Sequence, residues 1–269
     1  MSGLPVLEAF VDGPDGAPWV TFVPGIGNDA DFWRPQSDEL ASDHRTLRFE
    51  PWGCGGSEPP PEEVTIDDVA ASIVELWNRV GADQSSIVGL GFGGSTALYT
   101  ALRHPDRVNR VVACCCRPRQ PETRRQFWRD RQRYALDHGM VDLAEITVER
   151  WLSPEFRKRH PDVDDALRAA FRRNSVEGYS AYAGAFATMD FASQLAGVRA
   201  PSLLIAAEHD HGGGPIDSMR EMLGAIPDAH LAVVPGSGHI CNHEAPEFVN
   251  RLIRGHLAVI DDNRSGLMA

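Results

Sequence analysis

A glycine-rich turn over residues 85–95 constrains the fold of this 269-residue chain more than any other segment. It reads Ser-Ser-Ile-Val-Gly-Leu-Gly-Phe-Gly-Gly-Ser, a short apolar run that breaks into glycines. The frame Gly89-Leu90-Gly91-Phe92-Gly93 has the spacing of a G-x-S-x-G turn, which presents a nucleophilic serine between a strand and a helix. Glycine occupies position 91, where that motif has serine. The segment therefore predicts a strand–turn–helix unit without a nucleophile at its tip.

Strand-like and helix-like patterns alternate along the first 116 residues. Short apolar runs predict strands over 7–11, 19–23, 45–49, 86–90 and 107–115. Helical spacing of apolar residues predicts helices over 31–41, 65–80 and 93–102. This alternation is typical of an α/β fold with a mostly parallel sheet flanked by helices.

The pattern changes after residue 116. No strand-like run occurs over 117–190, where helical periodicity predicts an inserted helical cap. The α/β pattern then resumes, with strands over 202–207 and 231–234 and helices over 218–225 and 246–256. We therefore expect an α/β core formed by 1–116 and 191–260, a cap over 117–190, and a flexible tail over 261–269.

Composition excludes several classes of protein. A net charge of −12 argues against a nucleic-acid partner. No run approaches the ~20 apolar residues of a membrane span, and the N-terminus has no signal-peptide pattern, so we expect a cytoplasmic protein. The five cysteines are an odd number and favour reduced thiols. Lys158 is the only lysine among 26 basic residues, which suggests a GC-rich bacterial genome.

Candidate chemical groups follow several of the predicted strands. The pair Gly25-Ile26 follows one strand, Gly91 another, and Asp210 and His239 the last two. Ligands of open α/β sheets bind at the carboxyl ends of the strands, so these residues are expected at one edge. A carboxylate beside a histidine can fix its tautomer and poise it as a general base. In the competing interpretation Asp210 caps a turn and His239 is a satisfied polar residue.

Several motifs carry a resemblance to a known family. They are Val88–Gly94, Ala101–Val108, Gly236–His239 and Glu244–Pro246. On these motifs the chain resembles the α/β-hydrolase superfamily over nearly its whole length. Within the superfamily the cap is most similar to that of the 3-oxoadipate enol-lactonases. This similarity rests on the segments His138–Met140, Glu149–Phe156, Glu177–Tyr179 and Met189–Asp190.

The resemblance implies specific site residues. The family's acid falls on Asp210, its histidine on His239 and its nucleophilic serine on Gly91. The backbone amides of Ile26 and Phe92 would form the oxyanion hole. The residues expected to contact a small-molecule substrate are Gly25, Trp52, Cys54, Arg117 and Trp151. The loops depart from the family at Pro24, Glu50 and Cys54, where relatives commonly have histidine, aspartate and histidine.

The sequence contains a few other candidate nucleophiles and metal ligands. Ser95 lies one helical turn beyond Gly91, and Cys54 carries a thiol on a nearby loop, so both are weak candidate nucleophiles. His209 and His211 flank Asp210 but lack further ligands, so no metal is expected. The glycine spacing of the turn is not a dinucleotide fingerprint, and no cofactor is expected.

Seven arginines lie between residues 117 and 133, at the start of the predicted cap. The simpler interpretation is a solvated helix face. In the alternative, Arg117 or Arg119 points at a substrate carboxylate.

Four functions fit these features. The first is an enzyme acting on a lactone or ester, with His239 as general base and no covalent step at Gly91. The second is a lyase, isomerase or cofactor-independent oxygenase that uses the same His-Asp pair. The third is a serine hydrolase inactivated at position 91, and the fourth is a non-catalytic binding protein for a small molecule. Because glycine adopts positive φ readily, the fold should tolerate its presence in the turn. A homodimer is compatible with the sequence.

Overall fold

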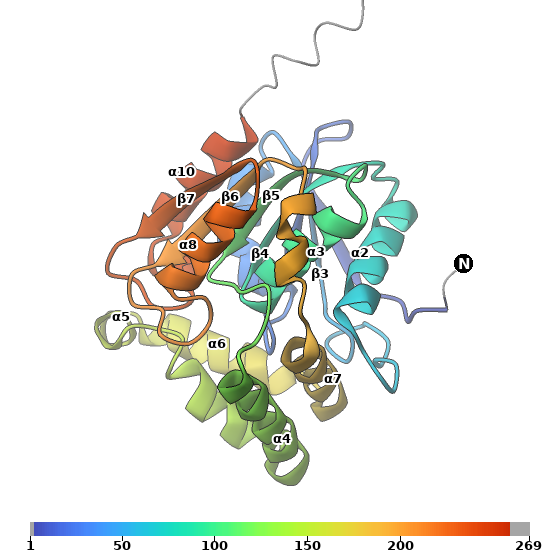
Figure 1. The fold of residues 1–269 in the computed structure, drawn as a ribbon. Coiled ribbons are helices and arrows are strands. Elements are labelled where there is room, and N and C mark those ends of the chain that lie inside the picture. The colour runs from blue at the N-terminus through green and yellow to red at the C-terminus, as the bar shows by residue number, and fades with distance from the viewer. Residues whose placement is uncertain (1–2, 259–269) are drawn as a thin grey trace, which may run out of the picture.

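A seven-stranded sheet forms the centre of the protein in a computed structural model, which describes residues 3–258. The strands lie in the order β1-β3-β2-β4-β5-β6-β7 (Figure 1). Their bounds are β1 Ala9–Asp12, β2 Trp19–Val23, β3 Arg45–Phe49, β4 Ser85–Leu90, β5 Val108–Cys114, β6 Ser202–Ala207 and β7 Ala229–Val234. Only β1 runs antiparallel, against β3. This arrangement confirms the predicted α/β fold with a mostly parallel sheet.

Helices cover both faces of the sheet. On one face lie α2 (Ile66–Val80), α3 (Phe92–Arg103) and α8 (Ile216–Ala225) (Figure 1). On the other, α1 (Arg34–Leu40) packs against α10 (Pro246–Leu257), with the short helix α9 (Cys241–Glu244) beside them. Two 3-10 helices, η1 (Ala30–Trp33) and η2 (Ala192–Gly197), complete the core.

The helix α2 illustrates how local sequence sets an element. Thr65 accepts a hydrogen bond from the Asp68 amide, and the Asp68 carboxylate accepts one from the Thr65 amide. This capping box satisfies two amides that the first helical turn leaves free. At the other end Gly81 adopts a left-handed conformation with φ 79°. The helix therefore begins and ends where its sequence provides a cap.

Four helices between β5 and β6 form the cap. They are α4 (Glu122–Val148), α5 (Pro154–Arg159), α6 (Pro161–Arg173) and α7 (Val176–Thr188). In Figure 1 they lie together beyond one end of the sheet. The long helix α4 is interrupted at Gly139, whose φ of 75° and ψ of −172° are not helical. A kink there lets two parts of α4 face the same space.

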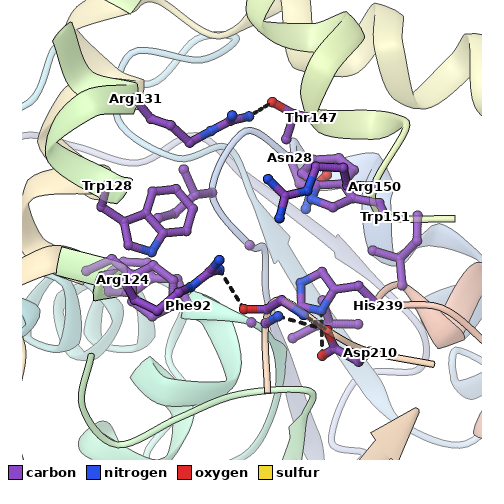
Figure 2. Close-up of a pocket in the computed structure, with 18 of the residues that line it drawn as sticks. Asn28, Phe92, Arg124, Trp128, Arg131, Thr147, Arg150, Trp151, Asp210 and His239 are labelled. Atoms are coloured by element: carbon purple, nitrogen blue, oxygen red, sulfur yellow. Dashed lines mark hydrogen bonds and ion pairs between the residues drawn. The ribbon is translucent and has the colours of Figure 1, made fainter. Parts of the chain in front are cut away.

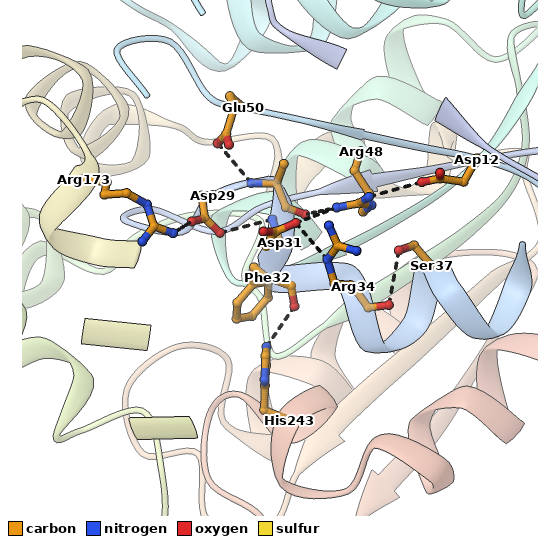
Figure 3. Close-up of polar contacts among 11 residues, drawn as sticks. Asp12, Asp29, Asp31, Phe32, Arg34, Ser37, Arg48, Glu50, Arg173 and His243 are labelled. Carbon is orange, nitrogen blue, oxygen red and sulfur yellow. Dashed lines mark hydrogen bonds and ion pairs between the residues drawn. The ribbon is translucent and has the colours of Figure 1, made fainter. Parts of the chain in front are cut away.

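Polar contacts tie the cap to the core (Figure 3). Arg173 of α6 forms an ion pair with Asp29, whose carboxylate also accepts a hydrogen bond from the Asp31 amide at 3.1 Å. Arg48 is buried and holds Asp31 at 2.9 Å and Asp12 at 3.2 Å. One continuous set of charges thus runs from β1 and β3 through η1 to the cap.

The predicted flexible tail over 261–269 lies outside the described residues. Within residues 3–258, no helix combines the length and apolar character that a membrane span requires.

Candidate active site

The turn at Gly91 has a sharply bent backbone. Gly91 lies between β4 and α3 with φ 60° and ψ −121°, a conformation that residues with a Cβ adopt only at a cost. Its amide donates to the Cys114 carbonyl at 2.9 Å, which fixes the turn against β5. A Cβ on Gly89 would lie 2.1 Å from the Gly93 carbonyl oxygen, and one on Gly93 would lie 2.3 Å from that of Val23. Glycine is therefore required sterically at 89 and 93, whereas at 91 it only removes strain.

The two predicted polar residues meet at the carboxyl edge of the sheet. Asp210 follows β6, His239 follows β7, and Nδ1 of His239 lies 2.9 Å from Oδ2 of Asp210. An ionised carboxylate can only accept, so Nδ1 carries the proton and Nε2 keeps its lone pair. The pair therefore presents Nε2 of His239 as a base.

The Asp210 carboxylate is buried, with 3% of the residue exposed, yet it is well satisfied. The amides of Gly212 and Gly213 donate to Oδ1 at 2.9 and 2.8 Å, and that of Gly214 donates to Oδ2 at 2.8 Å. Burial disfavours the charge, but His239 and these amides outweigh it and lower the pKa of Asp210. Asp210 is therefore held as an anion.

Gly213 packs directly on the imidazole of His239. A Cβ on Gly213 would lie 1.9 Å from Cε1 and 2.2 Å from Nδ1 of the ring. No side chain fits there unless the imidazole moves. The loop after β6 thus holds His239 in two ways, by the Asp210 hydrogen bond and by contact with the Gly213 backbone.

A side chain at residue 91 would face this base. A Cβ on Gly91 would lie 3.3 Å from Nε2 and 3.6 Å from Cε1 of His239, and, apart from the two chain neighbours, no other residue within 3–258 has an atom within 4 Å of it. His239 therefore points at the position that a serine side chain at the turn would take.

The two residues whose amides are expected to bind an oxyanion both lie at the cavity. Ile26 lies in the loop after β2, and Phe92 is the first residue of α3, where helical amides have no acceptor within the helix. Both residues line the cavity together with Gly91 and His239. We find no acceptor for either amide among residues 3–258. Their role as an oxyanion hole therefore stays a prediction.

A cavity of about 320 Å³ lies between this site and the cap (Figure 2). From the core it is lined by Gly25, Ile26, Gly91, Phe92, Asp210 and His239. From the cap it is lined by Arg124, Phe127, Trp128, Arg131, Thr147, Arg150, Trp151, Tyr179 and Phe186. Its size and mixed lining suit a small organic molecule.

Two of the five predicted substrate residues lie at the cavity and three do not. Gly25 and Trp151 line the cavity, whereas Trp52, Cys54 and Arg117 do not. Trp52 is buried and its indole N–H donates to the Pro5 carbonyl at 2.9 Å. Nε of Arg117 donates to the Gly213 carbonyl, so Arg117 supports the loop that holds His239. The Trp52 and Arg117 side chains are thus engaged by backbone carbonyls outside the substrate space.

Neither alternative nucleophile is placed for attack. The Ser95 hydroxyl is buried and donates to the carbonyls of Gly91 and Arg117 at 3.2 and 2.7 Å. Burial and then the nearby Glu50 raise the pKa of Cys54 to about 12, so its thiol stays protonated.

A metal does not suit this site. Single ligand atoms of Cys115, Asp210 and His239 lie within 4.8 Å of one another. Without a metal, the hydrogen bond to Cys241 and burial raise the pKa of Cys115 well above its usual value, so its thiol is protonated. The Asp210–His239 contact already uses the other two groups.

Sequence reasoning missed three cavity arginines, Arg124, Arg131 and Arg150. It had singled out Arg117 and Arg119 instead, and Arg119 is exposed. A signal was present, because Arg124, Phe127 and Arg131 are spaced to share one face of a helix.

The fold and this site define an enzyme class. The chain belongs to the family described as alpha/beta hydrolase fold, which matches residues 18–246.

Individual relatives are hydrolases. The chain is 25% identical over 239 residues to 3-oxoadipate enol-lactonase 2 of Acinetobacter baylyi, covering 88% of this chain and 87% of that protein. The crystal structure of the enol-lactonase from Burkholderia xenovorans superposes with a TM-score of 0.90 at 28% identity, covering 94% of this chain and 96% of the other. A thermophilic esterase from Thermogutta terrifontis gives a TM-score of 0.86 at 26% identity, covering 93% and 92%.

Proposed function

We propose that this protein hydrolyses a lactone or ester of a small molecule without a covalent enzyme intermediate. The observation that carries the proposal is that Nε2 of His239 points at the open position beside Gly91, in a cavity that Ile26 and Phe92 also line. The resemblance to 3-oxoadipate enol-lactonases supports the lactone class. A cytoplasmic location remains a prediction.

The proposed reaction needs only water and the substrate. His239 removes a proton from a water molecule as the water oxygen forms a bond to the substrate carbonyl carbon. The amides of Ile26 and Phe92 donate to the oxygen that becomes negative. When the tetrahedral intermediate collapses, the carbon–oxygen bond of the lactone or ester breaks. The imidazolium then returns its proton to the leaving oxygen.

Asp210 supports both proton transfers. Its fixed negative charge stabilises the imidazolium that forms on His239 and keeps Nδ1 as the donor. Because three backbone amides hold the carboxylate, the imidazole is oriented before substrate binds. Glycine at position 91 leaves the path between Nε2 and the carbonyl carbon free of a side chain.

Rapid-quench mass spectrometry of the intact protein tests this mechanism during turnover of 3-oxoadipate enol-lactone and aryl esters. We expect product to accumulate with no adduct on the wild type. As a matched control, Gly91→Ser supplies a hydroxyl at the same position and should give an acyl adduct. An adduct on the wild-type chain would contradict the proposal.

The same assay separates the other functions. Unchanged ligand after prolonged incubation would identify a binding protein. A product of unchanged mass would identify an isomerase, and a product that has lost a fragment without gaining water a lyase. Activity that appears only in Gly91→Ser would identify an inactivated serine hydrolase.

A further inference from the structure

Three arginine side chains surround one aromatic ring in the cap. The guanidinium carbons of Arg124, Arg131 and Arg150 lie 4.5, 5.1 and 5.3 Å from the ring centroid of Phe127. Contact with the face of the ring holds each cation while leaving the guanidinium edges free to donate. All four side chains line the cavity above His239, and Figure 2 shows the three arginines around it.

Within residues 3–258, none of the three pairs with a carboxylate. Arg131 instead contacts the hydroxyls of Tyr179 and Thr147. Arg124 donates to the Gly212 carbonyl at 2.5 Å, and its Nε is buried without a partner in the described chain. The Arg150 side chain lies over the ring of Phe127. By contrast, Arg168 and Arg172 of α6 both pair with Glu145.

Gathering these cations has a cost. Burial, and then the charges of Arg117 and Arg150, lower the pKa of Arg124 to about 10. A buried charge without a counterion destabilises a folded chain unless something bound there compensates it. A negatively charged ligand in the cavity would serve as a counterion for the buried charge. It would also reduce the repulsion between the arginines.

The net charge of the cavity lining indicates how many negative charges a ligand would need to neutralise it. Three arginines line the cavity, and Asp210 is the only carboxylate among its lining residues. With the histidines neutral, the lining therefore carries two net positive charges. A monocarboxylate would neutralise one of them, and a ligand with two negative charges would neutralise both.

We propose that the cap selects a substrate with two negative charges a few bonds apart, which the three arginines bind around Phe127. This inference rests on the proposed function, because the same cavity holds the reacting carbonyl. All three guanidinium carbons lie within 5.3 Å of one centroid, so no two are further apart than twice that distance. Such a span matches two carboxylates on one small molecule, or one phosphate between two guanidinium groups.

The arginine site also lies close to the base, because Arg124 contacts the loop that positions His239. Arg124 holds the Gly212 carbonyl, and the next residue, Gly213, packs on the His239 ring. A charged group bound at Arg124 therefore lies next to the loop that positions the base. Binding energy from the charged end can orient the carbonyl against Nε2.

Isothermal titration calorimetry with unreactive probes tests this inference separately from catalysis. The probes are glutarate, pentanoate (a monocarboxylate of the same chain length), inorganic phosphate and acetate, used with the wild type and with His239→Ala. We expect glutarate or phosphate to bind at least about tenfold more tightly than the two monoanions, in both proteins. Whichever dianion binds more tightly indicates whether dicarboxylates or phosphate esters are the preferred source. Equal binding of dianions and monoanions would overturn the inference.

Matched variants locate the effect. Arg150 is exposed at the edge of the cavity, so Arg150→Gln should fold normally and lose most of the preference for the dianion. Arg129→Gln and Arg133→Gln make the same charge change on exposed positions of α4 and should keep that preference. If all three variants lose the preference for the dianion to the same extent, the preference comes from the overall charge of the protein. That result would exclude the proposed site. Loss of turnover in His239→Ala with intact dianion binding would separate the two proposals.

Discussion

A Cβ built on Gly91 would lie 3.3 Å from Nε2 of His239, so the histidine faces the position that a side chain at residue 91 would occupy. The rest of the site keeps its polar partners. Asp210 accepts a hydrogen bond from the ring, and three backbone amides donate to Asp210. This geometry suits a base that acts on water instead of on a serine hydroxyl.

Gly91→Ser should supply a nucleophile at a cost in stability. The backbone at φ 60° and ψ −121° is strained for any residue with a Cβ, so we expect the free energy of unfolding to fall by about 1–3 kcal/mol. Gly91→Ala carries the same strain without a hydroxyl and is the control for urea unfolding. Equal stability of all three proteins would contradict the strain argument.

Gly213→Ala should displace His239. The new Cβ would overlap Cε1 of the ring at 1.9 Å, and loss of the base position should lower kcat by about 100-fold or more. Gly212→Ala is the matched control, because its Cβ would meet only Arg124, at 3.8 Å. Steady-state kinetics of both variants checks the expectation. Similar kcat values for the two would show that Gly213 does not position the ring.

Asp210 should make stability depend on pH. Its pKa is lowered in the folded state, so its contribution is present above the unfolded value of about 4 and is lost as pH falls further. The wild type should therefore be more stable than Asp210→Asn at neutral pH, and the difference should shrink in acid. Urea unfolding at several pH values measures this difference. Asp217→Asn removes an exposed carboxylate and should show little such change. A gap that widens on acidification would refute the assigned charge.

Glu244 joins the His239 loop to the cap. Its carboxylate accepts from the Ser153 amide at 2.7 Å, the Ser153 hydroxyl at 2.6 Å and the Gly238 amide at 3.0 Å. Glu244→Ala should lower the free energy of unfolding by about 1–3 kcal/mol, since these donors lose their acceptor. Exposed Glu247→Ala is the control, and thermal unfolding followed by circular dichroism compares them. Equal losses would mean that the Glu244 contacts contribute nothing specific.

Much of the fold could be predicted because its signals are local. Apolar runs and helical periodicity indicate the strands and helices, and the ends of parallel strands bring Asp210 and His239 together. The antiparallel pairing of β1 with β3 is long-range, and the short helix α9 has too little sequence to show periodicity.

The cavity lining was harder to predict. Trp52 lies on a loop near the site, but the direction of its side chain depends on a partner distant in sequence, the Pro5 carbonyl. Arg150 joins Arg124 and Arg131 only because α4 is interrupted at Gly139 and the chain turns after Val148. The spacing of residues along the sequence does not indicate that the chain turns back to the same cavity.

The most direct test of the account is kcat/KM of His239→Ala on the lactone or ester that the wild type turns over. A positioned general base contributes about 10²- to 10⁴-fold, so we predict a loss in that range with the fold intact by circular dichroism. Turnover by His239→Ala at the wild-type rate would contradict the central claim that His239 activates the attacking water.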